Sequence, residues 1–102
     1  MRIRRSTSRI STVATLANDA TPSVAGGKLF LTGGTTTITD FDDGVVSQTI
    51  VILSAHAVTI TDGSPIILAT SANFVMAAGD SLILTMFNDQ VWNETSRMIE
   101  TA

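Results

Sequence analysis

Short runs of apolar residues, separated by Gly, Asp and Asn, fill the chain from residue 28 onward. Short strands with regularly spaced turn signals are typical of an all-β domain. Acidic turns separate several of the runs, notably Asp42-Asp43-Gly44, Asp62-Gly63 and Asn88-Asp89. The strands that this pattern predicts cover residues 28–31, 35–40, 48–54, 57–61, 64–69, 73–76, 81–87 and 90–97.

Two of the predicted strands, 48–54 and 81–87, are apolar on both faces, since side chains alternate along a strand. Such a strand must be covered on both sides. A chain of 102 residues with few aromatic residues buries a two-sided core poorly by itself. We therefore expect an intertwined homotrimer, and the residues that we assign to its interface are Ile50, Val51, Ile52, Leu53, Leu82, Ile83, Leu84 and Met86.

A weak internal repeat refines the expected fold. The string Thr37-Ile38-Thr39-Asp40 recurs as Thr59-Ile60-Thr61-Asp62, at a spacing that suits one coil of a β-helix or one long hairpin. Repeated coils of this kind build solenoids. The predicted fold is a short-stranded β-helix-like, β-prism-like or sandwich-like knob.

The charge distribution divides the chain. Four arginines lie within the first nine residues, whereas the remainder holds two basic and nine acidic residues. A basic arm on an acidic body suggests that the arm contacts nucleic acid or an acidic protein surface, with a solvated tail as the alternative. We predict an extended or partly helical arm over 1–20, a Pro- and Gly-containing hinge over 21–27, the knob over 28–97 and a C-terminal tail over 98–102.

Candidate chemistry is sparse. The chain has no cysteine, which excludes disulfides and thiolate metal sites, and the single His56 has no obvious partner for base catalysis. We interpret Asp40, Asp42 and Asp43 as turn residues rather than as ligands of a hard cation, because a longer ligand loop is missing. We therefore expect no enzyme, metal, cofactor or small-molecule substrate. No apolar run is long enough for a bilayer, and the N-terminus lacks the apolar core of a signal peptide, so we expect an intracellular product.

A longer string of motifs resembles a short module of tailed-bacteriophage virion proteins. At Val46-Ser47 this chain departs from similar modules, which often carry Glu-Gly there. The matching residues run from about residue 21 to residue 97, and the most specific part is Thr37-Ile38-Thr39-Asp40-Phe41-Asp42-Asp43-Gly44; the others are Thr21-Pro22-Ser23-Val24, Gly26-Gly27, Phe30, Gln48, Ile50, Gly79-Asp80, Leu82, Leu84, Trp92, Glu94, Ser96 and Arg97.

The resemblance implies a trimeric virion component, since such modules often end tail fibres and tailspikes. With a basic arm in place of a long shaft, the chain suits a capsid cement or decoration protein on the capsid surface, made in the host cytoplasm. The partner is then the major capsid protein rather than nucleic acid. The alternatives are a small tail-fibre or tailspike component that docks on a tail or baseplate protein, and a carbohydrate-binding module using Trp92. The arm residues expected to bind the partner are Arg2, Ile3, Arg4, Arg5, Arg9, Ile10, Val13 and Leu16.

Overall fold

The computed structural model describes residues 13–100. Over this range the chain forms eight strands and no helix, so no helix there could span a membrane. This confirms the predicted all-β class. The strands are β1 (Val13–Thr15), β2 (Leu29–Leu31), β3 (Thr49–Leu53), β4 (Val58–Ile60), β5 (Ile66–Ile67), β6 (Phe74–Met76), β7 (Ser81–Asn88) and β8 (Val91–Met98).

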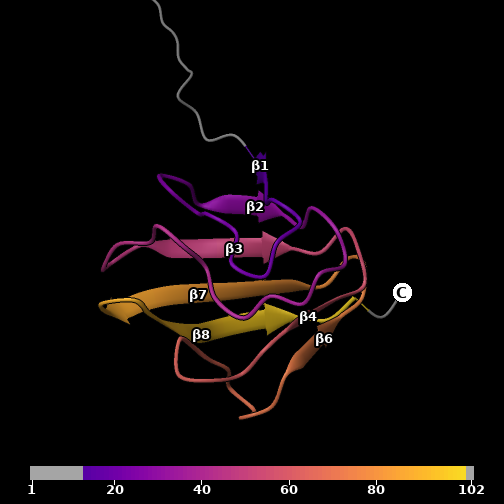
Figure 1. The fold of residues 1–102 in the computed structure, drawn as a ribbon. Helices are drawn as coiled ribbons and strands as arrows, with labels where there is room; N and C mark the ends of the chain where they lie inside the picture. Colours follow the sequence, from indigo (N-terminus) through magenta and orange to yellow (C-terminus); the bar gives the residue numbers. More distant parts are fainter. Residues whose placement is uncertain (1–12, 101–102) are drawn as a thin grey trace, which may run out of the picture.

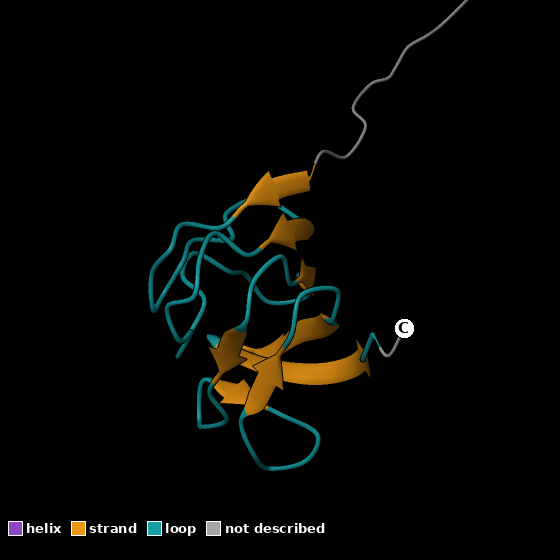
Figure 2. Cartoon of the chain, turned by 90° about the vertical axis from the view of Figure 1, so that its right-hand side faces the viewer, coloured by secondary structure: helices purple, strands orange, loops and turns teal. Residues whose placement is uncertain are grey.

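The strands form two sheets (Figure 1). The larger sheet has the order β1-β2-β3-β7-β8-β5, and the smaller pairs β4 with β6. In the larger sheet β1, β2 and β3 are parallel, whereas β7 is antiparallel to both β3 and β8. Figure 2 shows the loops and the small sheet gathered on one side of the large sheet. The molecule therefore has one strand layer and one mixed layer of loops and short strands.

The first half of the chain winds in parallel passes. Val13, Leu29 and Val51 occupy equivalent positions on β1, β2 and β3. In the second layer, the repeated Thr-Ile-Thr segments lie side by side, because Ile38 forms a parallel bridge with Ile60. The Ile38 amide donates to the Thr59 carbonyl at 2.9 Å, and the Thr61 amide donates to the Ile38 carbonyl at 2.9 Å. The internal repeat of the sequence thus marks neighbouring passes of the backbone.

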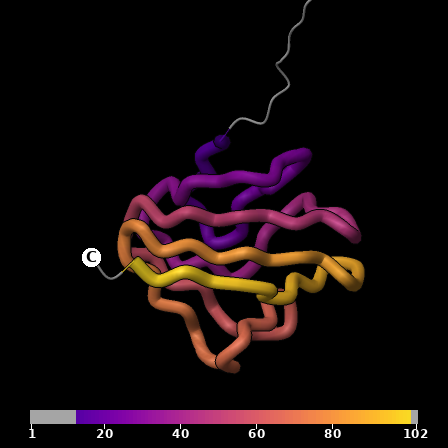
Figure 3. Tube along the Cα trace, turned by 180° about the vertical axis from the view of Figure 1, so that it is seen from behind, coloured from indigo at the N-terminus to yellow at the C-terminus, as the bar shows by residue number. Residues whose placement is uncertain are grey.

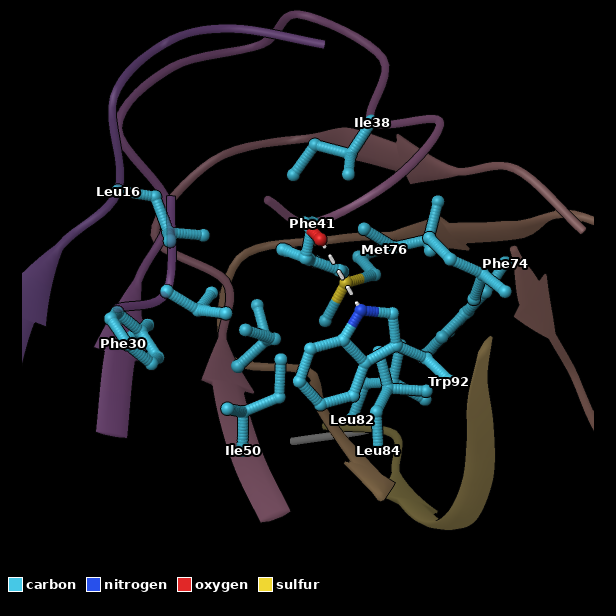
Figure 4. Packing of buried hydrophobic residues seen from close by; sticks show 14 of the residues in the cluster. Leu16, Phe30, Ile38, Phe41, Ile50, Phe74, Met76, Leu82, Leu84 and Trp92 are labelled. Carbon is cyan, nitrogen blue, oxygen red and sulfur yellow. Dashed lines mark hydrogen bonds between the residues drawn. The ribbon is translucent and has the colours of Figure 1, made fainter. Parts of the chain in front are cut away.

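The core lies between the two layers and is built around Trp92 (Figure 4). The Trp92 indole is fully buried and meets Phe41 edge to face, with ring centroids 6.2 Å apart. Its Nε1–H donates to the Phe41 carbonyl at 3.4 Å. Gly44 makes this packing possible, because a Cβ there would lie 2.4 Å from the Trp92 ring. The acidic turn predicted from the sequence therefore also covers the central tryptophan.

Two expectations from the sequence are corrected. Residues 35–40 do not form a strand; only Ile38 bridges, because this segment lies over the core as a loop with Ile38 buried and its neighbours exposed or half-buried. The predicted arm and hinge belong in part to the knob. Leu16, Pro22 and Val24 are buried, and the Asp42 amide donates to the Pro22 carbonyl at 3.0 Å.

The departure from the resembling modules also has a structural consequence. Ser47 has a φ of 81°, in the left-handed region that favours glycine. The turn is nevertheless formed, since the Gln48 amide donates to the Val45 carbonyl at 3.0 Å. The Gln48 side chain holds the turn further, because its Nε2 donates to the carbonyls of Val24 and Gly27, both at 2.9 Å.

Candidate functional site

The outer face of the large sheet is the candidate site. Figure 3 shows its strands running across the front of the molecule, with the loops behind them. The strand register places outward-pointing residues in rows, because paired residues share a face. One row reads Val13, Leu29, Val51, Ile83 and Ser96, and the next reads Thr15, Leu31, Leu53, Ser81 and Met98.

This face is apolar and exposed. Leu29, Leu53 and Phe87 are 37%, 41% and 61% exposed, and Val13 and Met98 are also exposed. Thr49 and Thr85 add a polar row in which the two hydroxyls are 2.9 Å apart. Exposed apolar side chains gathered on one face and bordered by polar residues are a feature of protein interaction sites. We name it the outer face, meaning the two rows above with Thr49, Thr85 and Phe87.

The outer face also carries no charged side chain. The only charged residues in the six strands of this sheet are Glu94 and Arg97, and both belong to the inner face, where they pair with Leu84 and Leu82 across the ladder. Their ion pair is bidentate, with Arg97 Nε and Nη2 donating to the Glu94 carboxylate at 2.7 and 2.8 Å. The Arg97 guanidinium also lies 4.0 Å from the centre of the Phe74 ring. The pair therefore joins β8 to the smaller sheet.

We predict that this ion pair makes the free energy of unfolding depend on pH in the acidic range. The hydrogen bonds from Arg97 hold the pKa of Glu94 below its ordinary value of 4.5, against an opposing effect of burial. A carboxylate with a lowered pKa stabilises the fold fully above its ordinary pKa, and this contribution is lost as the pH falls through the folded value. In urea titrations below pH 4.5, the wild-type chain should lose stability more steeply than Glu94→Gln. Equal slopes for the two proteins would contradict this role.

A groove of about 780 Å³ opens at one end of the outer face. Leu29 and Val51 contribute to its lining, together with Lys28, Asp43 and Val45 from the surrounding loops. The groove thus continues the apolar surface of the sheet up to a polar rim. It contains no aromatic side chain on which a sugar or base could stack.

The structure divides the eight predicted interface residues between the two faces. Val51, Leu53 and Ile83 point outward and remain candidates for an interface. The other five are fully buried within the single chain, because the loops and the small sheet cover the inner face; these are Ile50, Ile52, Leu82, Leu84 and Met86. Their assignment to an interface is corrected, since each chain provides that cover itself.

The predicted arm residues are also divided. Arg2, Ile3, Arg4, Arg5, Arg9 and Ile10 lie outside the described residues. Val13 is exposed on β1, whereas Leu16 is 3% exposed and belongs to the core. Leu16 is therefore unavailable to a partner while the knob is folded.

The polar candidates have structural partners. His56 Nδ1 lies 2.9 Å from the Thr32 hydroxyl, whose oxygen also accepts from the Ala55 amide at 2.9 Å. Asp43 accepts from the Ser23 hydroxyl, and Asp40 accepts from the Phe41 amide at 2.8 Å. Within residues 13–100, no group of three or more His, Cys, Asp or Glu side chains is arranged to hold a metal ion.

Reasoning from the sequence missed four apolar contributors to the outer face: Leu29, Leu31, Phe87 and Met98. The alternation in residues 28–31 could have indicated that Leu29 and Leu31 share a face opposite Phe30.

Comparison of the chain with family models, curated proteins and solved structures gave no match.

Proposed function

We propose that this chain is a non-enzymatic structural protein of a tailed-bacteriophage virion, a trimeric cement or decoration protein on the capsid. The observation that carries the proposal is the uncharged, apolar outer face, which a single chain leaves in contact with water. A trimer in which the outer faces of the three chains meet around one axis would cover this surface. The resemblance to modules of phage virion proteins is the reason for proposing that the chain belongs to a virion.

The charges favour other copies of the chain as the cover. Beyond the first nine residues the chain has two basic and nine acidic residues, so this part carries a strong negative charge. Two knobs therefore repel each other in most orientations. The outer face is free of charge, so copies can approach there without bringing carboxylates together. Desolvating its apolar side chains then provides the driving force for association.

The basic N-terminal residues are the proposed contact with the shell. Arginine forms two parallel hydrogen bonds to a carboxylate, which suits pairing with an acidic protein surface. In a trimer, three such contacts reinforce one another through effective concentration. The second candidate is a small tail-fibre or tailspike component, because the resembling modules often end such fibres. Both candidates share the trimer and differ in where the arms attach.

Deleting residues 2–12 tests the role of the arm. The deletion removes all four N-terminal arginines but keeps β1 and the buried Leu16. We expect the truncated protein to stay a folded trimer and to lose binding to purified particles in a cosedimentation assay. Deleting residues 101–102 instead serves as the control and should leave binding intact. Undiminished particle binding of the N-terminal truncation would overturn the proposed role.

A further inference from the structure

The free edge of β1 is a second surface that one chain leaves incomplete. Among the described residues, β1 is the first strand of the large sheet and pairs only with β2, in parallel. Its residues Val13, Ala14 and Thr15 are all exposed. An exposed strand edge presents main-chain groups that another strand can pair with, and natural edges are blunted by shortness, charge, Pro, a bulge or a covering segment. β1 is short, at three residues, but it carries no charge, Pro or bulge within Val13–Thr15.

The hydrogen-bond pattern identifies which groups face outward. The Leu16 amide donates to the Leu31 carbonyl at 2.8 Å, so the backbone of Leu16 points toward β2. Along a parallel ladder alternate residues point to opposite sides, so Ala14 also points toward β2 while Val13 and Thr15 point away. Among residues 13–100 there is no strand on that side of β1, so the amides and carbonyls of Val13 and Thr15 have no ladder to join there.

The second layer is open on the same side. The Val24 amide donates to the Asp42 carbonyl at 2.9 Å, and the Asp42 amide donates to the Pro22 carbonyl. In the parallel bridge between Ser23 and Asp42, Asp42 makes both hydrogen bonds, one to each residue that flanks Ser23. The main-chain groups of Ser23 itself therefore point away from Asp42. Within residues 13–100, β1 and Ser23 therefore both lie at the end of the parallel stack with no further strand beside them.

The opposite edge of the same sheet is closed by the chain itself. At β5 the Ile66 carbonyl accepts from the Gly63 amide at 2.8 Å. The Leu68 amide, just beyond β5, donates to the Asp62 carboxylate at 2.9 Å. One edge is thus capped by its own loop, whereas no segment within residues 13–100 caps the β1 edge.

We propose that the β1 edge accepts an extended segment of another protein as an added strand, and that acidic residues flank this segment. Addition of a strand satisfies the outward groups of Val13 and Thr15, which supply affinity without requiring a particular sequence. The flanking charge follows from the sequence, which has four arginines among residues 2–9, before β1, on a body that otherwise repels carboxylates. This inference names the kind of segment that the proposed shell partner offers, and to that extent it rests on the proposed function.

Amide exchange in the full-length protein is the first test. In the free protein the Val13 and Thr15 amides should exchange rapidly, while the Leu16 amide, bonded to Leu31, should be protected. Protection of Val13 and Thr15 before any peptide is added would mean that another copy, or the chain's own first residues, already fills the edge. That result would overturn the proposal.

Peptide titration is the second test. The probe is a synthetic peptide with alternating Thr and Val between glutamate flanks, and the comparison peptide has lysine flanks. We expect the acidic peptide to protect the Val13 and Thr15 amides and to bind roughly tenfold more tightly or better, since like charges across an interface are strongly unfavourable. Equal affinities, protection elsewhere, or no binding of either peptide would contradict the proposal.

A matched pair of variants links binding to the edge. Thr15→Pro removes an amide that points away from β2, so the fold should persist and peptide binding should be lost. Thr15→Val keeps the amide and the branched shape, and it should bind as the wild type does. Retained binding by a folded Thr15→Pro would refute strand addition. Because no particles are used, this inference can fail while the proposed function stands, and the reverse also holds.

Discussion

Replacing Val51 with glutamate is expected to convert the proposed trimer into folded monomers. Val51 lies in the middle of the outer face, between Leu29 and Ile83 in the strand register. In a single chain its side chain is partly exposed, so a charged replacement there can remain hydrated. In a trimer joined through this face, three carboxylates would be taken out of water near one another, at a cost of several kcal/mol each. Sedimentation velocity should therefore report the mass of one chain, 10.7 kDa.

Val51→Thr is the matched control, because it keeps the branched shape without adding charge. We expect it to remain trimeric. Ile52→Asp, one position along, should instead unfold the chain, because Ile52 is fully buried in the core of the same subunit. A trimer that survives Val51→Glu would show that the outer face is not the interface.

Trp92→Ala is expected to have the largest effect on stability among truncations of the core. The ring is fully buried against Phe41 and Gly44, and its N–H reaches the Phe41 carbonyl. Truncation of a buried Trp to Ala costs about 3–5 kcal/mol. Domains of this size are stable by only about 5–15 kcal/mol, so a large fraction of the stability would be lost. Urea unfolding of the variant and the wild type under the same conditions measures the difference.

Phe87→Ala provides the comparison for Trp92→Ala. Phe87 is an aromatic residue on the neighbouring strand, but its side chain is 61% exposed on the outer face. Measured in the monomeric Val51→Glu background, the change should cost little stability. Similar losses for Trp92→Ala and Phe87→Ala would contradict the assignment of Trp92 to the centre of the core.

Local patterns in the sequence predicted most of the strands. Alternation and turn residues placed β2, β3, β4, β6, β7 and β8 within about one residue of their observed bounds, which is the usual uncertainty of a strand end. The segment 35–40 was predicted as a strand because Thr and Ile favour extended backbone. Its long-range contacts decided otherwise: Ile38 turns into the core and bridges Ile60, while Thr37 and Thr39 stay exposed.

The candidate site was predictable only in part, because alternation sorts residues into two faces without saying which one is covered. Ile52 and Val51 are equally apolar in the sequence, yet one is in the core and the other on the outer face. The choice depends on where the loop that bears Phe41 and the strand that bears Met76 pack, and these segments are far from β3 along the chain. The same limit hid the role of Leu16, because the mixed polar and apolar residues around it gave no clear alternation that would indicate burial.

The copy number of this chain per purified particle tests the central proposal most directly. Quantitative mass spectrometry against the major shell protein provides the ratio. A capsid cement protein predicts a copy number comparable with that of the shell protein, in multiples of three. A trace copy number would contradict the capsid assignment and favour the tail, and absence from the particle would contradict a virion role altogether.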